Sequence, residues 1–500
     1  MKEEATQSEN PNGNQSGNQS GNQSGSSSGS PSTNQNVNPS HAGWLERLGL
    51  VGFSALEAPL LAALVTGSPL LLIGAHGTAK SLLLTRIALA LSLEFRHYNA
   101  SLLNFDDLVG FPLPGKDGSL QYVQTPASIW GAEAVIFDEI SRCRPEIQNK
   151  LFPLIHERRV QGLLLEQLRY RWAAMNPPST DDDDNGYLGS EPLDVALADR
   201  FALVVTMPDW SQFSASQQLA VIRAQDQPLE TAEILRLKSL LSLAERILAG
   251  LSEEFAAGVA RYVQTVVALL IQAGVALSPR RANILYRNVL AVNAAALALD
   301  PNCSATDATL LALRCSLPQA ALGVAVSEIK LLSAHKEAVR TFDLKVSDPL
   351  RAILCAINPL ERLELAVKAT KLPKVEFSRV VADALAQLTH GAREAAVVYL
   401  FETGAVGRLN TAIAAQAGEL YRDLVAAPTF SETLHASHTR YTTWGRIKDL
   451  LSRLNPSDPR AHLQANAIAA LFAKKHLQTP QDAEQAFAGF AKTDSQLRQQ

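Results

Sequence analysis

The sequence has 500 residues, 47% of them hydrophobic, which is enough apolar material for about three domains and more than one core. Its formal net charge is −4, so no general basic excess attracts phosphate backbones, and wholesale coating of nucleic acid is disfavoured. The four cysteines are not spaced as a metal knuckle or a redox pair, which fits a reducing cytosol.

Residues 1–40 are predicted to be a disordered, low-complexity tail. The unit Gly-Asn-Gln-Ser occurs three times between Gly13 and Ser24, and the segment has almost no apolar side chains to offset the entropy of ordering. The first ten residues lack the basic start and apolar core of an export signal. The most hydrophobic stretch, residues 58–73, is interrupted at residues 67–69 and is too short for a span of about 20 residues. We therefore expect a cytoplasmic protein without a membrane span.

Residues 41–210 are predicted to form an α/β domain. Short apolar runs typical of strands alternate with helical patterns, and this order indicates a doubly wound parallel sheet. The predicted strands cover residues 69–73, 95–100, 134–137, 171–175 and 202–206, and the clearest helices cover residues 80–92 and 145–158.

Beyond residue 210, segments with helical periodicity predominate. They are rich in Ala and Leu and cover residues 231–251, 255–274 and 280–299. Pro and Asp mark a break at residues 345–350. We predict an α-helical domain at residues 211–340 and a further α-helical domain at residues 341–500, for which the sequence indicates no chemistry.

A glycine-rich loop lies between the first predicted strand and the next helix. The backbone N–H groups of such a loop, together with a helix N-terminus, bind phosphate. Lys80 would contact the β- and γ-phosphates of ATP, and the Ser81 hydroxyl would bind Mg²⁺. The usual glycine before the lysine is Ala79, whose β-carbon is expected to narrow the approach of phosphate to the backbone. A plain strand-to-helix turn is the alternative for this loop, which consists of Gly74, Ala75, His76, Gly77, Thr78, Ala79, Lys80 and Ser81.

Two carboxylates follow the predicted strand at residues 134–137. Acids at this end of a strand face the crevice in which open α/β sheets bind ligands. Asp138 would hold Mg²⁺, and Glu139 would polarise the attacking water. A strand ending in solvated acids is the simpler interpretation, but two motifs in this order favour a nucleotide site.

Two further polar residues follow in the same region. Asn176 comes directly after the strand at residues 171–175 and can orient water near the γ-phosphate. Arg200 precedes the strand at residues 202–206, and an arginine can stabilise transition-state charge in phosphoryl transfer. Taken alone, each residue is more simply a turn asparagine or a surface arginine.

Together these motifs resemble the AAA+ ATPases, and within them the MoxR-type group, over residues 44–335. The loop GAHGTAKS is similar to that group's loop, in which alanine often precedes the lysine. The segments FDEISRCRPEIQNKLFPLIHERRV, AAMNPP and EPLDVALADRF resemble its Walker B, sensor 1 and arginine-finger regions. The resemblance implies an AAA+ P-loop domain with an α-helical lid. It makes Asn176 sensor 1 and Arg200 a finger acting on the neighbouring subunit's nucleotide.

The resemblance extends to the lid and to the loops of the sheet. Ser278-Pro279-Arg280 is similar to the sensor 2 motif, which makes Arg280 the candidate for a γ-phosphate contact in its own subunit and Arg281 a close competitor. His76 stands where proline is common and is interpreted as a loop residue without a catalytic role. The acidic run at residues 181–184 is more simply a solvated loop tip than a cation site. Residues 105–122 and 160–170 fit inserted hairpins, which line the pore of related rings.

The implied activity is Mg²⁺-dependent ATP hydrolysis that drives remodelling of a protein. The resemblance implies a ring, expected to be a hexamer, and a protein client or adaptor, in this group often one with a von Willebrand factor A domain. A nucleic-acid-linked AAA+ motor of the restriction or helicase type is the alternative, but the hairpin segments contain few basic residues. A module that binds ATP without turnover would have lost Glu139 or Arg200, and both are present.

Overall fold

The computed structural model describes residues 43–114, 120–179, 190–224, 228–342, 344–345, 347–426 and 439–499. The predicted tail at residues 1–40 and the acidic run at residues 181–184 lie outside these ranges.

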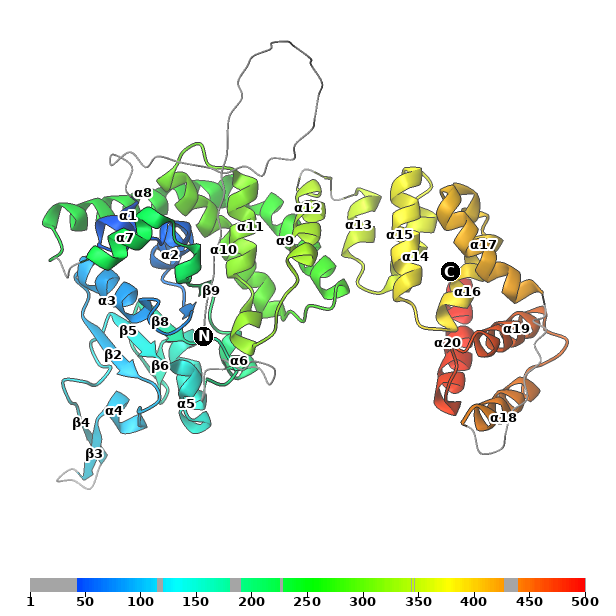
Figure 1. The fold of residues 1–500 in the computed structure, drawn as a ribbon, viewed down its shortest axis with the longest axis horizontal. Coiled ribbons are helices and arrows are strands. Elements are labelled where there is room, and N and C mark those ends of the chain that lie inside the picture. Colours follow the sequence, from blue (N-terminus) through cyan, green and yellow to red (C-terminus); the bar gives the residue numbers. More distant parts are fainter. Residues whose placement is uncertain are drawn as a thin grey trace, which may run out of the picture. The chain divides into compact units, whose positions relative to one another are not determined.

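A parallel sheet forms the centre of the α/β region (Figure 1). Its strand order is β2-β5-β8-β1-β9, and each neighbouring pair is parallel. The carboxyl ends of the strands therefore lie along one edge of the sheet, as the predicted doubly wound fold requires. The strands are β1 (Leu70–Ile73), β2 (Phe95–Asn99), β5 (Ala134–Asp138), β8 (Tyr170–Met175) and β9 (Leu203–Thr206).

Each face of the sheet is covered by helices because successive strand residues point to opposite sides. In β1, Leu70 and Leu72 join one apolar cluster, whereas Leu71 and Ile73 join another. The first cluster includes α2 (Glu57–Thr66) and α3 (Lys80–Ala90). The second includes α4 (Phe105–Val109), α5 (Pro145–Glu157) and α6 (Val195–Ala198).

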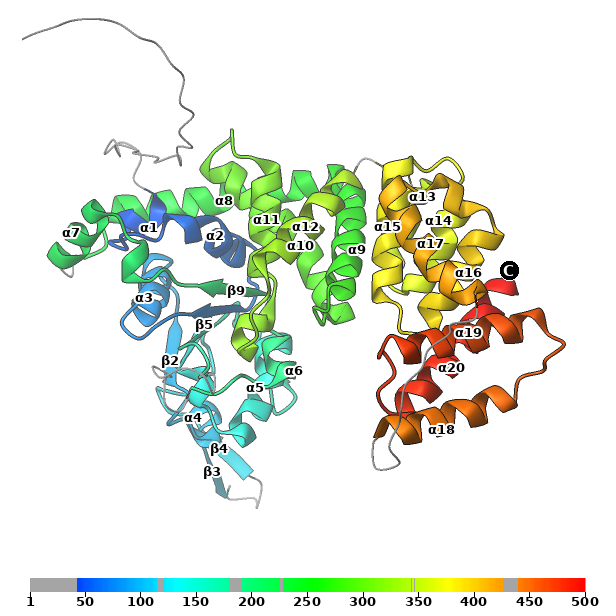
Figure 2. The same ribbon diagram turned by 45° about the vertical axis from the view of Figure 1, so that its right-hand side comes forward.

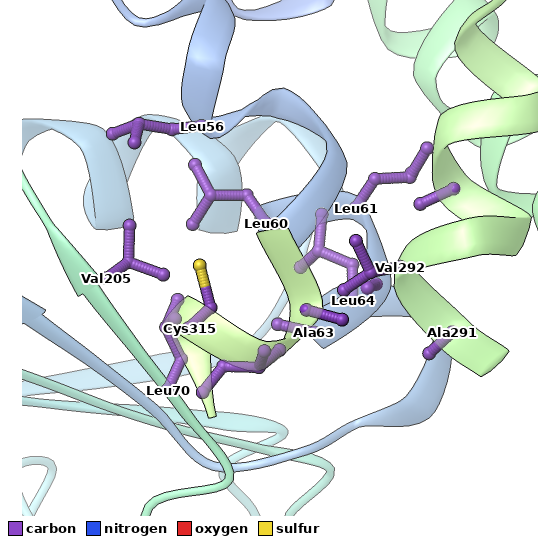
Figure 3. Close-up of a cluster of buried hydrophobic side chains, with 14 of the residues drawn as sticks. Leu56, Leu60, Leu61, Ala63, Leu64, Leu70, Val205, Ala291, Val292 and Cys315 are labelled. Carbon is purple, nitrogen blue, oxygen red and sulfur yellow. The ribbon is translucent and has the colours of Figure 1, made fainter. Parts of the chain in front are cut away.

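The most hydrophobic stretch of the sequence becomes the buried helix α2. All residues from Pro59 to Val65 are buried, because α2 packs between the sheet and the long helix α10 (Pro279–Leu299). Its side chains meet residues of β1, β9, α10 and α11 (Ala305–Cys315). Figure 3 shows Leu60, Leu61, Ala63 and Leu64 of α2, with Leu56 just before the helix, beside Leu70, Val205, Ala291, Val292 and Cys315. The α/β region and the helices that follow it therefore share one core.

Two antiparallel hairpins overlap the segments predicted at residues 105–122 and 160–170, although residues 105–109 form α4 and the second hairpin ends at residue 164. The longer pairs β3 (Phe111–Pro114) with β4 (Leu120–Val123), and the shorter pairs β6 (Arg159–Val160) with β7 (Leu163–Leu164). Five large apolar side chains on them are at least 45% exposed: Phe111, Leu113, Val123, Leu163 and Leu164. Both hairpins thus present apolar side chains to solvent.

The next region is helical, as expected for a lid. Its helix α10 packs against α2, α8 (Thr231–Glu254), α9 (Ala256–Gln272) and α11. By length and composition, α10 is apolar enough to cross a membrane, as is the pair α8 and α9 if its 80° bend is ignored. Packing on these neighbours accounts for the apolar character of α10. This region also contains α7 (Ala215–Arg223) and α12 (Glu328–Arg340). The short helix α1 (Trp44–Arg47) precedes α2 in the chain.

The C-terminal region is entirely helical in its described part (Figure 2). It contacts the lid through α9, where the Gln272 amide donates to the carbonyls of Leu354 (3.2 Å) and Ala356 (2.9 Å). The connecting residue Phe342 packs on Gly258, and Arg261 donates two hydrogen bonds to its carbonyl. The helices are α13 (Pro349–Cys355), α14 (Pro359–Lys368), α15 (Lys374–Gln387), α16 (Ala392–Glu402), α17 (Thr411–Val425), α18 (Thr439–Ser452), α19 (Pro459–Ala473) and α20 (Pro480–Arg498).

Candidate active site

The glycine-rich loop leaves β1 and enters α3 at Lys80. A β-carbon at Gly74 would lie 2.7 Å from the Met207 Cβ and 2.8 Å from the Thr78 Oγ1, so this position has no room for a side chain. Gly77 has a φ of 77°, which favours glycine. Thr78 closes the loop by donating its hydroxyl to the Ala75 carbonyl at 2.7 Å, and His76 is exposed. The backbone is therefore held in a compact turn at a helix N-terminus, as phosphate binding requires.

Ala79 adopts the left-handed conformation that explains why glycine is usual at its position. Its φ is 59°, which costs a residue with a β-carbon about 1 kcal/mol. The methyl group packs against the apolar cluster beneath α3. The methyl group thus contacts the core, and the expectation that it narrows the approach of phosphate to the backbone stays a prediction.

Lys80 joins the loop to the end of β8. Its side chain is buried, and Nζ donates to the carbonyls of Gly74 and Ala75, both at 2.8 Å, and to the Asn176 Oδ1 at 3.1 Å. Burial lowers the pKa of Lys80, and the nearby carboxylates oppose this shift. Asn176 reaches the lysine because β1 and β8 are parallel neighbours, with Ile73 opposite Met175. Two residues 96 positions apart thus meet at the predicted edge of the sheet.

Ser81 and Asp138 meet at the same edge. The Ser81 hydroxyl donates to the Asp138 Oδ2, and the Glu139 N–H donates to the Oδ1 at 2.9 Å. Burial by itself raises the pKa of Asp138, but hydrogen bonds from His97, Ser81 and the Glu139 N–H lower it overall. Asp138 is therefore held as a carboxylate.

This pair of oxygen donors fits Mg²⁺. Magnesium prefers hard oxygen ligands and keeps several waters, so one hydroxyl and one carboxylate supply enough protein ligands. Among the described residues no cluster of three or more His, Cys, Asp or Glu side chains could hold another metal. Glu139 follows directly in a left-handed conformation, with φ 53°, and its carboxylate accepts no hydrogen bond from any described residue. It is available to bind water.

Sequence reasoning missed His97. Its Nε2 lies 3.7 Å from the Asp138 Oδ2, because β2 pairs with β5 in a register that places Asn99 opposite Asp138. His97 reaches Asp138 only because β2 is the neighbour of β5 in the sheet. The sequence around His97 does not indicate this pairing.

Arg200 lies at the opposite edge of the sheet. It precedes β9, and the N–H groups of Ala202 and Leu203 donate to the carbonyl of Pro69, which precedes β1. Lys80 follows β1, so a four-residue strand, about 13 Å long, and the glycine-rich loop separate the two residues. The Arg200 guanidinium donates to the Ala196 carbonyl at 2.7 Å and lies 4.6 Å from the Phe152 ring centre.

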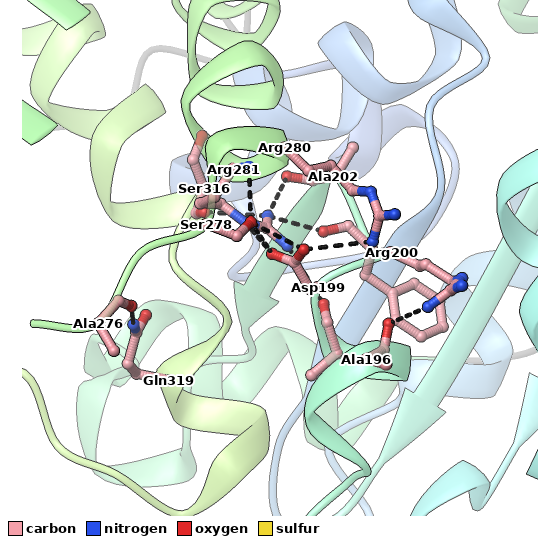
Figure 4. Close-up of polar contacts among 12 residues, drawn as sticks. Ala196, Asp199, Arg200, Ala202, Ala276, Ser278, Arg280, Arg281, Ser316 and Gln319 are labelled. Carbon is pink, nitrogen blue, oxygen red and sulfur yellow. Dashed lines mark hydrogen bonds and ion pairs between the residues drawn. The ribbon is translucent and has the colours of Figure 1, made fainter. Parts of the chain in front are cut away.

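The two lid arginines differ in burial and in partners (Figure 4). Arg281 is 1% exposed, and its guanidinium donates to Asp199 and to the carbonyls of Phe201, Ser316 and Ala198. The Arg280 side chain is 41% exposed, and its guanidinium meets only Asp199 among the described residues, at 3.4 Å. Arg281 is thus a structural residue, and Arg280 is the one able to reach a ligand.

Arg280 lies with Arg200 at the amino edge of the sheet. Asp199 pairs with the Arg280 guanidinium, whereas the Ala196 carbonyl holds that of Arg200. Burial, followed by the charge of Arg280, lowers the pKa of Arg200. The sequence-based assignment of Arg280 to the nucleotide of its own subunit does not fit this placement, because Lys80 is at the carboxyl edge.

Comparison with known families agrees with this site. Residues 69–207 match the family model described as AAA domain (dynein-related subfamily), and this range contains every proposed site residue except Arg280. The fold and the site therefore define an AAA-type nucleotide-binding domain within the chain. The match to this domain family implies a site for ATP, and the MoxR-type subgroup is not separately identified.

One solved structure resembling the chain is described as a "putative ATPase" from Cytophaga hutchinsonii. It is 18% identical, the match covers 52% of this chain and 79% of that chain, and the TM-score is 0.37. An overlap at this TM-score supports no inference about function. No protein of curated function matches the sequence.

Proposed function

We propose that the chain is a cytoplasmic MoxR-type AAA+ ATPase that hydrolyses ATP with Mg²⁺, assembles as a hexameric ring and remodels a protein partner. The observation that carries this proposal is the meeting of Lys80, Ser81, Asp138 and Asn176 at one edge of the sheet. These residues come from three separate motifs, and their chemistry is that of phosphate and Mg²⁺ binding.

Each residue has a distinct role in the proposed reaction. Lys80 would exchange its carbonyl partners for phosphate oxygens, and Ser81 and Asp138 would hold Mg²⁺, which would neutralise charge on the phosphates. Glu139 takes a proton from water as the water oxygen bonds to the γ-phosphorus and the bond to the β-phosphate oxygen breaks. Asn176 orients that water.

The finger acts between subunits in this proposal. Arg200 lies at the edge of the sheet opposite Lys80, so a neighbouring subunit must present its nucleotide to it. We extend the same argument to Arg280, which shares this edge. In a closed ring, the glycine-rich loop of every subunit would face the Arg200 of one neighbour, and its own Arg200 would face the loop of the other neighbour.

The exposed hairpins are the proposed contacts with the client. Phe111 is opposite Val123 across the β3–β4 pair, so their side chains share a face, and Leu113 is on it as well. An exposed apolar face of this kind suits contact with a protein. The client, including one with a von Willebrand factor A domain, would be engaged more tightly in the ATP state.

Two variants test the proposed chemistry. Lys80→Ala should abolish binding of a fluorescent ATP analogue, whereas Glu139→Gln should preserve binding and stop phosphate release. Adding EDTA to the wild type should stop turnover. If Glu139→Gln loses binding as fully as Lys80→Ala, the assigned roles are wrong.

Partner capture tests the remodelling role. Immobilised Glu139→Gln should retain a discrete protein from native lysate with ATP and release it with ADP. Equal recovery in both states, or recovery of nucleic acid instead of protein, would overturn the remodelling role and favour the nucleic-acid-linked motor.

A further inference from the structure

The residue before the finger arginine has a nearly buried carboxylate. The Asp199 side chain is 14% exposed and accepts the Ser278 hydroxyl at 3.1 Å and 2.9 Å on its two oxygens. It also accepts from Arg281 (3.2 Å) and Arg280 (3.4 Å). Its three donors all come from the start of α10, as Figure 4 shows. Asp199 therefore connects the lid to the finger loop, residues 199–202, which lies between α6 and β9.

The loop backbone is tied to the lid on both sides of Asp199. Arg281 donates to the Ala198 carbonyl at 3.3 Å and to the Phe201 carbonyl at 2.9 Å. Ser278 in turn caps α10, since its hydroxyl accepts from the Arg281 N–H at 3.0 Å. A helix N-terminus also stabilises a nearby carboxylate. The start of α10 and the finger loop thus form one connected unit.

The direction of the finger depends on this loop. Arg200 makes no ion pair with Asp199 among the described residues; its guanidinium is held by the Ala196 carbonyl and the Phe152 ring. The Arg200 Nε is buried without a hydrogen-bond partner in the described part of the chain. A shift of the loop backbone would therefore move the guanidinium directly.

We infer that Asp199 is a positioning residue that couples the lid of each subunit to the finger that the same subunit presents to its neighbour. This inference rests on the proposed function, in which Arg200 acts between subunits. Any movement of the lid caused by nucleotide would then be passed through α10 and Asp199 to Arg200. The coupling needs a charge, because Arg280 and Arg281 both face this carboxylate and a neutral amide would leave them unpaired.

Mixing inactive variants tests where Asp199 acts. Asp199→Asn should bind a fluorescent ATP analogue as the wild type does, and its kcat should fall on the order of 10²-fold, as for a misplaced catalytic group. Mixed with Lys80→Ala, it should regain turnover, because some interfaces then pair an intact loop with an intact finger. Mixed with Arg200→Ala, it should regain none, because both variants lack a working finger. Asp348→Asn removes the same charge at the start of α13 in the C-terminal region but keeps an oxygen acceptor for the helix cap; it is the matched control and should keep full turnover.

The reverse pattern would overturn the inference. Recovery with Arg200→Ala but not with Lys80→Ala would mean that Asp199 serves the nucleotide of its own subunit, and an unchanged kcat would mean that it positions nothing. The pair Arg200→Ala with Lys80→Ala tests the proposed function separately: no recovery in rings shown to exchange subunits refutes a finger acting between subunits. If Asp199→Asn does not fold, Ser278→Ala removes the lid side of the same contact, and the same two mixtures decide.

Discussion

Replacing Arg281 by alanine should destabilise the protein far more than replacing its neighbour Arg280. Arg281 is 1% exposed. Its loss would leave Asp199 and the buried carbonyls at residues 198, 201 and 316 without the hydrogen bonds that Arg281 donates to them. Breaking a buried charged pair costs about 3–5 kcal/mol. Asp199 keeps Ser278 and Arg280 as donors, so we expect the lower value, about 3 kcal/mol.

This free energy corresponds to a measurable change in melting temperature. Each kcal/mol shifts Tm by about 2–4 °C in a domain of 150–250 residues, so Arg281→Ala should lower it by about 6–12 °C. Arg280 makes one partly exposed contact at 3.4 Å, worth about 0–1 kcal/mol, so Arg280→Ala should change Tm by less than about 4 °C.

Calorimetry and phosphate release on both variants separate the two roles. Arg280→Ala should remain folded and lose most ATPase turnover, since we propose that Arg280 acts at the nucleotide of a neighbouring subunit. Equal loss of Tm in the two variants, or an unchanged Tm in Arg281→Ala, would refute the division into a structural and a functional arginine.

Three further changes test the packing and the hairpins. Gly258→Val should lower the free energy of unfolding by about 1–3 kcal/mol in denaturant titration, because even a β-carbon there would lie 2.4–2.8 Å from the Phe342 ring; Gly250→Val, where nothing lies within 4 Å, is the control for loss of glycine. Leu61→Ala should cost about 2–5 kcal/mol because Leu61 is fully buried, whereas Leu82→Ala, at a position 47% exposed, should cost no more than about 0.5 kcal/mol. Joint replacement of Phe111 and Leu113 by serine should leave basal ATPase turnover unchanged and weaken retention of the captured client; unchanged retention would exclude this hairpin as the contact.

The sequence was sufficient for the features that depend on local patterns. The five parallel strands and the helices α8, α9 and α10 lie within a few residues of their predicted positions. Alternating apolar runs and helical periodicity are properties of short segments, so they need no knowledge of the remote chain. The glycine-rich loop and the acids after β5 were also visible, since strand ends in such sheets converge on one edge.

The C-terminal region shows the opposite case. The sequence predicts its helices, but its attachment to the lid depends on side chains such as Gln272 and Phe342, whose partners lie more than 80 residues away. No pattern within either segment indicates that pairing.

Only the tertiary structure decided between Arg280 and Arg281. Neighbouring residues on a helix differ by about 100° around its axis, so one of them faces the sheet and the other does not. Which one is buried depends on how α10 packs on the finger loop, and this packing cannot be predicted from the residues near Arg280 and Arg281. The same reason applies to Ala79, whose methyl group turned toward the core, and to His97, which reaches Asp138 only because β2 is the neighbour of β5.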